Sequence, residues 1–212
     1  VSTMFRVVIG EGQSQPQPTQ HEQYVFTNLE QTHSFVLNTD SLTLQSTNYG
    51  TFDEFSGHFL KGLTVVHDAV QLDFIDRVGL RYLDHVQPKP GEELAQYVPE
   101  VMGLSDKLGG RTVHSYWEAL RFVEAVGQRT RILIQDGPLA FPPDLMPEGL
   151  VVQSRFMQSH GQHALIDTDG FLEGRCLFDE SAVQQQLGTI HGVISDAFKR
   201  TVTEKAFKTW DE

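Results

Sequence analysis

Residues 73–86 read DFIDRVGLRYLDHV, and their apolar and polar side chains alternate. Alternate side chains of a β-strand point to opposite faces of its sheet. The positions that would share one face are Phe74, Asp76, Val78, Leu80, Tyr82, Asp84 and Val86. The other face would carry Arg77 and Arg81, with Gly79 leaving a notch between their guanidinium groups. We therefore predict a strand with one mainly apolar face that packs under helices and a second face that presents arginine.

The segment before this strand, residues 51–70, has the pattern of an amphipathic helix. Thr51 and Glu54 have the spacing of a capping box, in which each side chain accepts a hydrogen bond from the backbone amide of the other residue. The apolar residues that recur at steps of three and four are Phe52, Phe55, Phe59, Leu63, Val66 and Val70. Gly57 and Gly62 lower the helix propensity, but they allow the helix to lie close to a sheet.

Residues 181–202 predict a second long helix, with Asp179 as its N-cap. Its apolar stripe consists of Val183, Leu187, Ile190, Ile194, Ala197 and Phe198. A stripe of this spacing is typical of a helix that buries one side against another element.

The rest of the chain predicts mainly strands. Residues 33–49 contain the turn sequence NTD between two alternating apolar runs, which indicates a hairpin. Residues 111–126 fit a helix or a strand, and we favour a long strand paired with residues 128–137. Two further strands are predicted over residues 150–160 and 163–178.

These elements predict an α+β fold, with a mostly antiparallel sheet covered on one side by the two long helices. The 212 residues are enough for one large domain or for two small ones that share a sheet. Strands followed by a capped helix occur in both halves of the chain, about 1–90 and 110–212. We therefore predict a single domain, with an internal duplication as a hypothesis.

The composition limits the partners of the protein. The formal net charge of −12 disfavours general binding to nucleic acids and to anionic membranes, although a local basic groove is compatible with it. Cys176 is the single cysteine, so no disulfide can form within the chain, which fits a reducing compartment. The sequence has neither a membrane-spanning apolar run nor the layout of a signal peptide. We expect a cytoplasmic protein that does not associate with membranes.

The arginine-bearing face predicts one candidate site. Guanidinium groups bind carboxylate or phosphate in a bidentate manner, so Arg77 and Arg81 could hold an anionic ligand. Arg121, with Tyr116 and Trp117 nearby, could stack on a base or a peptide, or these aromatic rings could pack in a core. The alternative for the arginines is cross-strand ion pairing. The carboxylates available for such pairs are Glu118, Glu124, Asp167, Asp169 and Glu173.

A second candidate site is a metal centre. His160 and His163 lie close together in the sequence and are followed by Asp167 and Asp169. Imidazole and carboxylate groups are ligands for zinc or manganese, although nine histidines in the chain make a chance cluster easy. The sequence has no Gly-x-Ser-x-Gly elbow and no phosphate-binding loop. We predict no cofactor and favour a role other than catalysis.

Three segments resemble a known family. They are TNYGTFDEFSGHFLKGL (47–63), DRVGLRYLDHV (76–86), and HALIDTDGFLEGRCLFD (163–179) with the closing TVTEKAFKTWDE (201–212). In this order they are similar to a bacterial family of unknown function described as sporadically distributed, and the resemblance covers about residues 24–212. Asp84 stands where that family usually has Asn. The resemblance implies no activity and no catalytic residues, and the patchy distribution implies genes of mobile or defence-linked loci.

The sequence therefore predicts a non-catalytic binding or accessory protein of a bacterial cytoplasm. Its arginine-bearing sheet face would engage an anionic small molecule or an acidic segment of a partner protein. Two alternatives stay open: a metal-dependent hydrolase that uses the His/Asp cluster, and a structural subunit that forms homo-oligomers through a sheet edge or a helix face.

Overall fold

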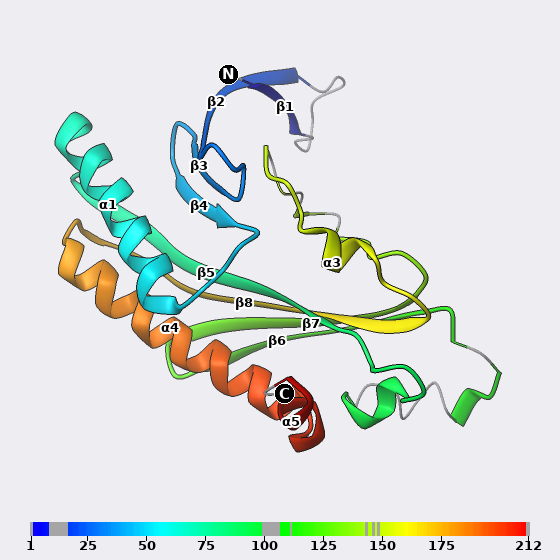
Figure 1. The fold of residues 1–212 in the computed structure, drawn as a ribbon. Helices are drawn as coiled ribbons and strands as arrows, with labels where there is room; N and C mark the ends of the chain where they lie inside the picture. The colour runs from blue at the N-terminus through cyan, green and yellow to red at the C-terminus, as the bar shows by residue number, and fades with distance from the viewer. Residues whose placement is uncertain are drawn as a thin grey trace. The chain divides into compact units, whose positions relative to one another are not determined.

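The fold was analysed in a computed structural model, which describes residues 2–8, 17–98, 107–110, 112–142, 144–145, 147 and 149–210 (Figure 1). The chain divides into two compact units. The first unit comprises Val1–Ala69 with Phe141–Gln153, and the second comprises Val70–Ala140 with Ser154–Glu212.

The first unit contains a four-stranded antiparallel sheet in the order β1-β2-β3-β4. The strands are β1 (Ser2–Val8), β2 (Gln17–Thr27), β3 (His33–Leu37) and β4 (Leu42–Ser46). The predicted hairpin is confirmed, because β3 pairs with β4 and the Asn38 amide donates to the Ser41 carbonyl across the turn.

Helix α1 (Phe52–Val70) belongs mainly to the first unit. The predicted capping box is present: the Thr51 amide donates to the Glu54 carboxylate, and the Glu54 amide donates to the Thr51 hydroxyl. Gly62 of α1 lies so close to the Phe35 ring of β3 that a Cβ at this position would overlap the ring. Gly62 therefore has the packing role that the sequence predicts, whereas Gly57 has open space around it.

The second unit contains an antiparallel sheet in the order β5-β8-β7-β6 (Figure 1). Its strands are β5 (Phe74–Val86), β6 (His114–Val123), β7 (Val126–Asp136) and β8 (Gln162–Leu177). The ambiguous segment is thus a strand, as favoured, and Glu124 takes a left-handed conformation in the turn to β7.

Helix α4 (Glu180–Thr201) lies along one face of this second sheet (Figure 1). The Asp179 carboxylate accepts a hydrogen bond from the Ala182 amide, as predicted for the N-cap. The buried residues of α4 are Val183, Leu187, Ile190, Ile194 and Ala197, which are members of the predicted stripe. Gly170 of β8 lies directly beneath Ile190 and Ile194, so the missing side chain lets α4 approach the sheet.

The end of this core is closed by shorter elements. The 3-10 turn η1 (Leu94–Gln96) and helix α5 (Glu204–Trp210) bring Tyr97 and Ala206 against the sheet residues Ile134 and Ile166. All four of these residues are fully buried. The core therefore extends beyond the part of the sheet that α4 alone covers.

The predicted α+β class is confirmed. The sequence predicts that both long helices cover one sheet; α4 covers the second sheet, whereas α1 belongs mainly to the first unit. The described strands form two sheets, one in each unit, rather than the single sheet that the sequence predicts. The internal duplication stays a prediction.

The predicted strand over residues 150–160 is wrong, because this segment contains the short helix α3 (Ser154–Met157). Its apolar residues occur in two runs, Leu150–Val152 and Phe156–Met157, separated by three polar residues. This pattern does not alternate along the segment as a half-buried strand requires.

Candidate functional site

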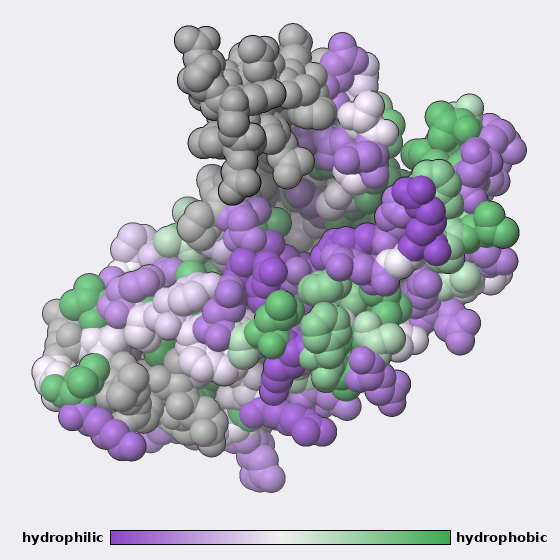
Figure 2. Space-filling view, turned by 180° about the vertical axis from the view of Figure 1, so that it is seen from behind, coloured by the Kyte–Doolittle hydropathy of each residue, from purple (hydrophilic) through white to green (hydrophobic). Residues whose placement is uncertain are grey.

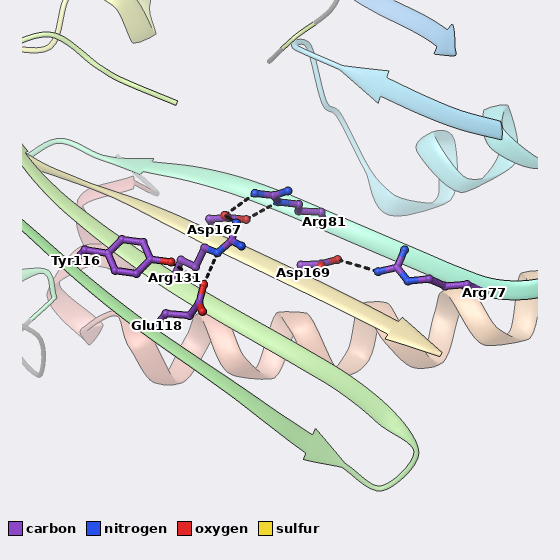
Figure 3. A network of polar contacts seen from close by, with 7 residues as sticks. All are labelled: Arg77, Arg81, Tyr116, Glu118, Arg131, Asp167 and Asp169. Carbon is purple, nitrogen blue, oxygen red and sulfur yellow. Dashed lines mark hydrogen bonds and ion pairs between the residues drawn. The ribbon is translucent and has the colours of Figure 1, made fainter. Parts of the chain in front are cut away.

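The two faces of the second sheet differ in chemistry. The face under α4 carries Val78 and Leu80 of β5, with Leu80 opposite Gly170. The face turned away from α4 is charged (Figure 3). We call it the charged face, and its charged residues are Arg77, Arg81, Glu118, Arg129, Arg131, Asp167, Asp169 and Glu173. The alternation of β5 therefore separates apolar from charged side chains as predicted.

Asp167 is the centre of the charged face, and its side chain is only 1% exposed. Arg81 donates two hydrogen bonds to it, from Nε to Oδ1 and from Nη2 to Oδ2, each 2.7 Å long. Arg131 donates to the same carboxylate at 3.3 Å and to Glu118 at 2.6 Å. Glu118 also accepts a hydrogen bond of 2.6 Å from the Tyr116 hydroxyl. These contacts hold Arg81 and Arg131 in fixed positions (Figure 3).

Arg77 is held less tightly. Its side chain is 47% exposed, and its nearest carboxylate oxygens belong to Glu173 at 3.5 Å and Asp169 at 3.8 Å. The guanidinium carbon lies 4.9 Å from the centre of the Phe171 ring. A Cβ at Gly79 would lie 2.8 Å from Nη1 of Arg77, so Arg77 itself lies over the predicted notch.

Arg129 has neither an ion pair nor a side-chain hydrogen bond among the described residues, although it stands opposite Asp169 in the sheet. Burial raises the pKa of Asp169 above its ordinary value, even though three nearby guanidinium groups act to lower it. Arg77 and Arg129 therefore have the weakest direct contacts to carboxylates among the described arginines of the charged face.

Cross-strand ion pairing, the alternative interpretation of the arginines, is confirmed for most of the expected carboxylates. Pairs form with Glu118, Asp167, Asp169 and Glu173. Glu124 lies in the turn between β6 and β7 instead. The arginines therefore contribute to the packing of the sheet, whatever else they bind.

Arg121 lies apart from the other two predicted ligand-binding residues. It stands opposite Gln128 of β7, and paired residues of neighbouring strands point to the same side of a sheet. Gln128 precedes Arg129, which lies on the charged face, so Gln128 and Arg121 point to the α4 side. Its Nη2 donates a long hydrogen bond of 3.4 Å to Gln128. Arg77 and Arg81 share the charged face, and Arg121 does not.

The predicted metal ligands are not brought together. His160 is exposed, His163 is fully buried, and Asp167 is held by two arginines. His163 and Asp167 lie four residues apart on one strand, a separation of roughly 13 Å. In the part of the chain that the structure describes, no three His, Cys, Asp or Glu side chains form a group that could bind a metal.

A small pocket beside α3 contains residues that the sequence did not single out. Its volume is about 330 Å³, and it is lined by His85, Gln87, Arg155, Phe156, Gln158 and Ser159. Nε2 of His85 lies 3.2 Å from the hydroxyl of buried Ser159, and the His85 ring lies 5.0 Å from the ring of His163. His85 and Ser159 are far apart in the sequence, so no local motif could have indicated this pair.

The pKa values of two neighbouring residues of β5 are shifted in opposite directions. Burial raises the pKa of Asp84 to about 6. Burial, with a smaller effect from His163, lowers the pKa of His85 to about 4. Below the pKa that Asp84 has in the unfolded chain, the carboxyl group is neutral in both states and its burial favours folding most. This stability is lost as the pH rises toward 6, because the carboxyl group ionises more easily in the unfolded chain. The His85 contribution is complete above its unfolded pKa and is lost as pH falls toward 4, so the two partly cancel.

Replacing Asp84 with Asn should remove the loss of stability that ionisation of Asp84 causes above its unfolded pKa. We expect the free energy of unfolding at pH 7 to increase by roughly 2–3 kcal/mol, because the buried carboxylate no longer has to ionise. The advantage over the wild type should shrink as the pH falls from 6 to 4. Urea unfolding of both proteins across this pH range measures it. Parallel stability profiles would show that Asp84 ionises as easily in the fold as in the unfolded chain.

Comparison with known proteins gives no family assignment: no family model matches the chain, and no curated protein or solved structure is significantly similar to it. The resemblance to the sporadically distributed bacterial family therefore stays a prediction. Among the helices that the structure describes, none combines the length and apolar character needed to cross a membrane.

Proposed function

We propose that this chain is a non-catalytic cytoplasmic binding protein whose charged face engages an anionic group. The group would be a carboxylate or phosphate, carried by a small molecule or by an acidic segment of a partner. The observation that supports this proposal most is that Arg77 forms only long ion pairs, at 3.5 and 3.8 Å, and that Arg129 forms none among the described residues.

Arg77 can approach a ligand in a way that Arg81 cannot. Arg77 is half-exposed and its ion pairs are long, whereas Arg81 already forms a bidentate pair with buried Asp167. The pair with Asp167 uses the Nε and Nη2 edge of the Arg81 guanidinium, so this edge cannot bind a second carboxylate or phosphate. We therefore propose Arg77 and Arg129 as the ligand-binding residues, with Arg81 and Arg131 as their fixed support.

The charge balance of the face favours one anionic group rather than a polyanion. The four arginines of the charged face stand beside four carboxylates, Glu118, Asp167, Asp169 and Glu173. The net charge of −12 also repels long anionic chains. A nucleic acid is therefore a poor candidate ligand.

Replacing both Arg77 and Arg129 with Gln tests the proposal. Isothermal titration calorimetry with inorganic phosphate and with a short glutamate-rich peptide should show binding to the wild type and at least about tenfold weaker binding to the double variant. Arg175→Gln is the matched control, because Arg175 is an exposed arginine of β8 that pairs with Asp76 outside the charged face. Equal binding by the double variant, or no binding of either probe by the wild type, would contradict the proposal.

A further inference from the structure

Strand β6 forms one edge of the second sheet. It pairs with β7 without interruption, from His114 opposite Gln135 to Val123 opposite Val126. The other side of β6 has no partner strand among the described residues. An edge strand presents a row of backbone amide and carbonyl groups that can pair with another strand.

The two edges of this sheet differ in how they are protected. Edge strand β5 contains an irregularity in its register between Ile75 and Arg77 and a glycine, Gly79, in its interior. Bulges and covering elements are the usual means by which proteins prevent edge pairing. The sequence of β6, HSYWEALRFV, contains no proline, glycine or lysine, and its register is regular. Edge β6 is therefore the one that remains able to pair.

Large apolar side chains gather along β6. Tyr116, Trp117, Leu120, Phe122 and Val123 are each between 42% and 70% exposed. On the face drawn in Figure 2, hydrophobic (green) residues gather in patches among hydrophilic (purple) ones. Single exposed apolar residues are common on protein surfaces, but a contiguous group indicates an interaction surface.

We propose that β6 pairs in antiparallel orientation with β6 of a second copy of the chain, which joins the two sheets into one. A two-fold axis perpendicular to the sheet would pass between the strands at Ala119. Ala119 would then stand opposite its own mate, Trp117 opposite Arg121 and Tyr116 opposite Phe122. These pairs bring together two aromatic rings and place a guanidinium beside an indole.

Charge excludes two neighbouring registers and is compatible with this one. An axis at Glu118 or at Arg121 would place like charges opposite each other, which destabilises strand pairing. An axis at Ala119 places Glu118 opposite Leu120 instead. Although the whole chain carries a charge of −12, the ten residues of β6 contain one Glu and one Arg, so the edge itself is close to neutral. An edge that is self-complementary in this way fits a second copy.

Leu120→Glu should dissociate the dimer. Within its own chain the new carboxylate stands opposite Arg129, so the fold should tolerate it. Across the interface it stands opposite Glu118, and symmetry repeats this repulsion. We expect the dimer dissociation constant, measured by sedimentation velocity over a concentration series, to rise by at least about tenfold. Leu177→Glu is the control, because Leu177 is also exposed and adds the same charge outside β6.

A disulfide tests the register. In a Cys176→Ser background, Ala119→Cys should give a covalent dimer on mild oxidation, because cross-strand Cβ atoms at this position would be close enough. Phe122→Cys should not, because its mate would lie six residues along the strand, roughly 20 Å away. A wild type that stays monomeric at all concentrations overturns the proposal. A dimer that Leu120→Glu leaves intact, or equal cross-linking by both cysteine variants, overturns it as well.

Discussion

Replacing Asp167 with Ala should lower the free energy of unfolding by about 3–5 kcal/mol. The Asp167 carboxylate is almost completely buried and is bound by Arg81 and Arg131. Both guanidinium groups are themselves mostly buried, so the variant would remove the bidentate carboxylate of Arg81 and one of the two carboxylates bound by Arg131, in a poorly solvated position. For a chain of this size the midpoint of thermal unfolding should fall by roughly 10 °C. Urea and thermal unfolding measure both quantities.

The chain offers a matched control in Asp76. Arg175 donates two hydrogen bonds to Asp76, at 2.7 and 3.0 Å, so the geometry resembles that of the buried pair. Both side chains are more than half exposed, and exposed ion pairs add little to stability. Asp76→Ala should therefore be close to the wild type. If Asp167→Ala were equally harmless, the buried ion pairs would not support the charged face.

The second large effect is expected at Ile190, where α4 meets the sheet. Ile190 is fully buried, and Ile190→Ala should lower the free energy of unfolding by about 2–5 kcal/mol, because it removes apolar contacts and leaves a cavity. Urea unfolding of the variant measures the loss. Val65→Ala in α1 is the control, since Val65 is largely exposed and its truncation should change stability by less than about 0.5 kcal/mol.

Gly170 makes this prediction specific to the contact between α4 and β8. A Cβ at Gly170 would lie 2.7 Å from Cγ2 of Ile190, so Gly170→Ala alone should destabilise the fold by about 1–3 kcal/mol. In the double variant with Ile190→Ala, the added methyl group enters part of the space that the isoleucine has left, and only its close contact with Ile194 remains. The double variant should be more stable than the sum of the single effects predicts. Strict additivity would show that the two positions do not share this space.

The parts of the fold that could be predicted from the sequence depend on local periodicity. The alternation over residues 73–86 correctly assigned Val78 and Leu80 to the buried face and Arg77 and Arg81 to the other. The caps at Thr51 and Asp179 correctly marked the starts of the two long helices. These signals are readable because a helix or strand repeats its geometry every few residues, and each repeat adds to the same pattern.

The candidate site could be predicted only in part. Arg77 and Arg81 were identified from their own strand, but the pattern could not show that Arg81 is bound by Asp167, 86 residues later in the chain. Arg129 gave no local signal that separates it from the other strand arginines. Arg121 was predicted to belong to the site, but it lies on the opposite face of the sheet. Successive residues of a strand point to opposite faces, so an error of one residue is enough to assign a side chain to the wrong face.

The sequence by itself thus determined the type of most segments, although not that of residues 150–160, and which side of most of them is apolar. Only the tertiary structure decided that the strands divide between two sheets, that β6 is left at an edge, and which arginines find a carboxylate. The physical reason is that a period of two is satisfied by any strand order and by many registers. Strand order and register are fixed by packing between distant segments, such as Gly170 beneath Ile190 and Ile194, which no local pattern contains.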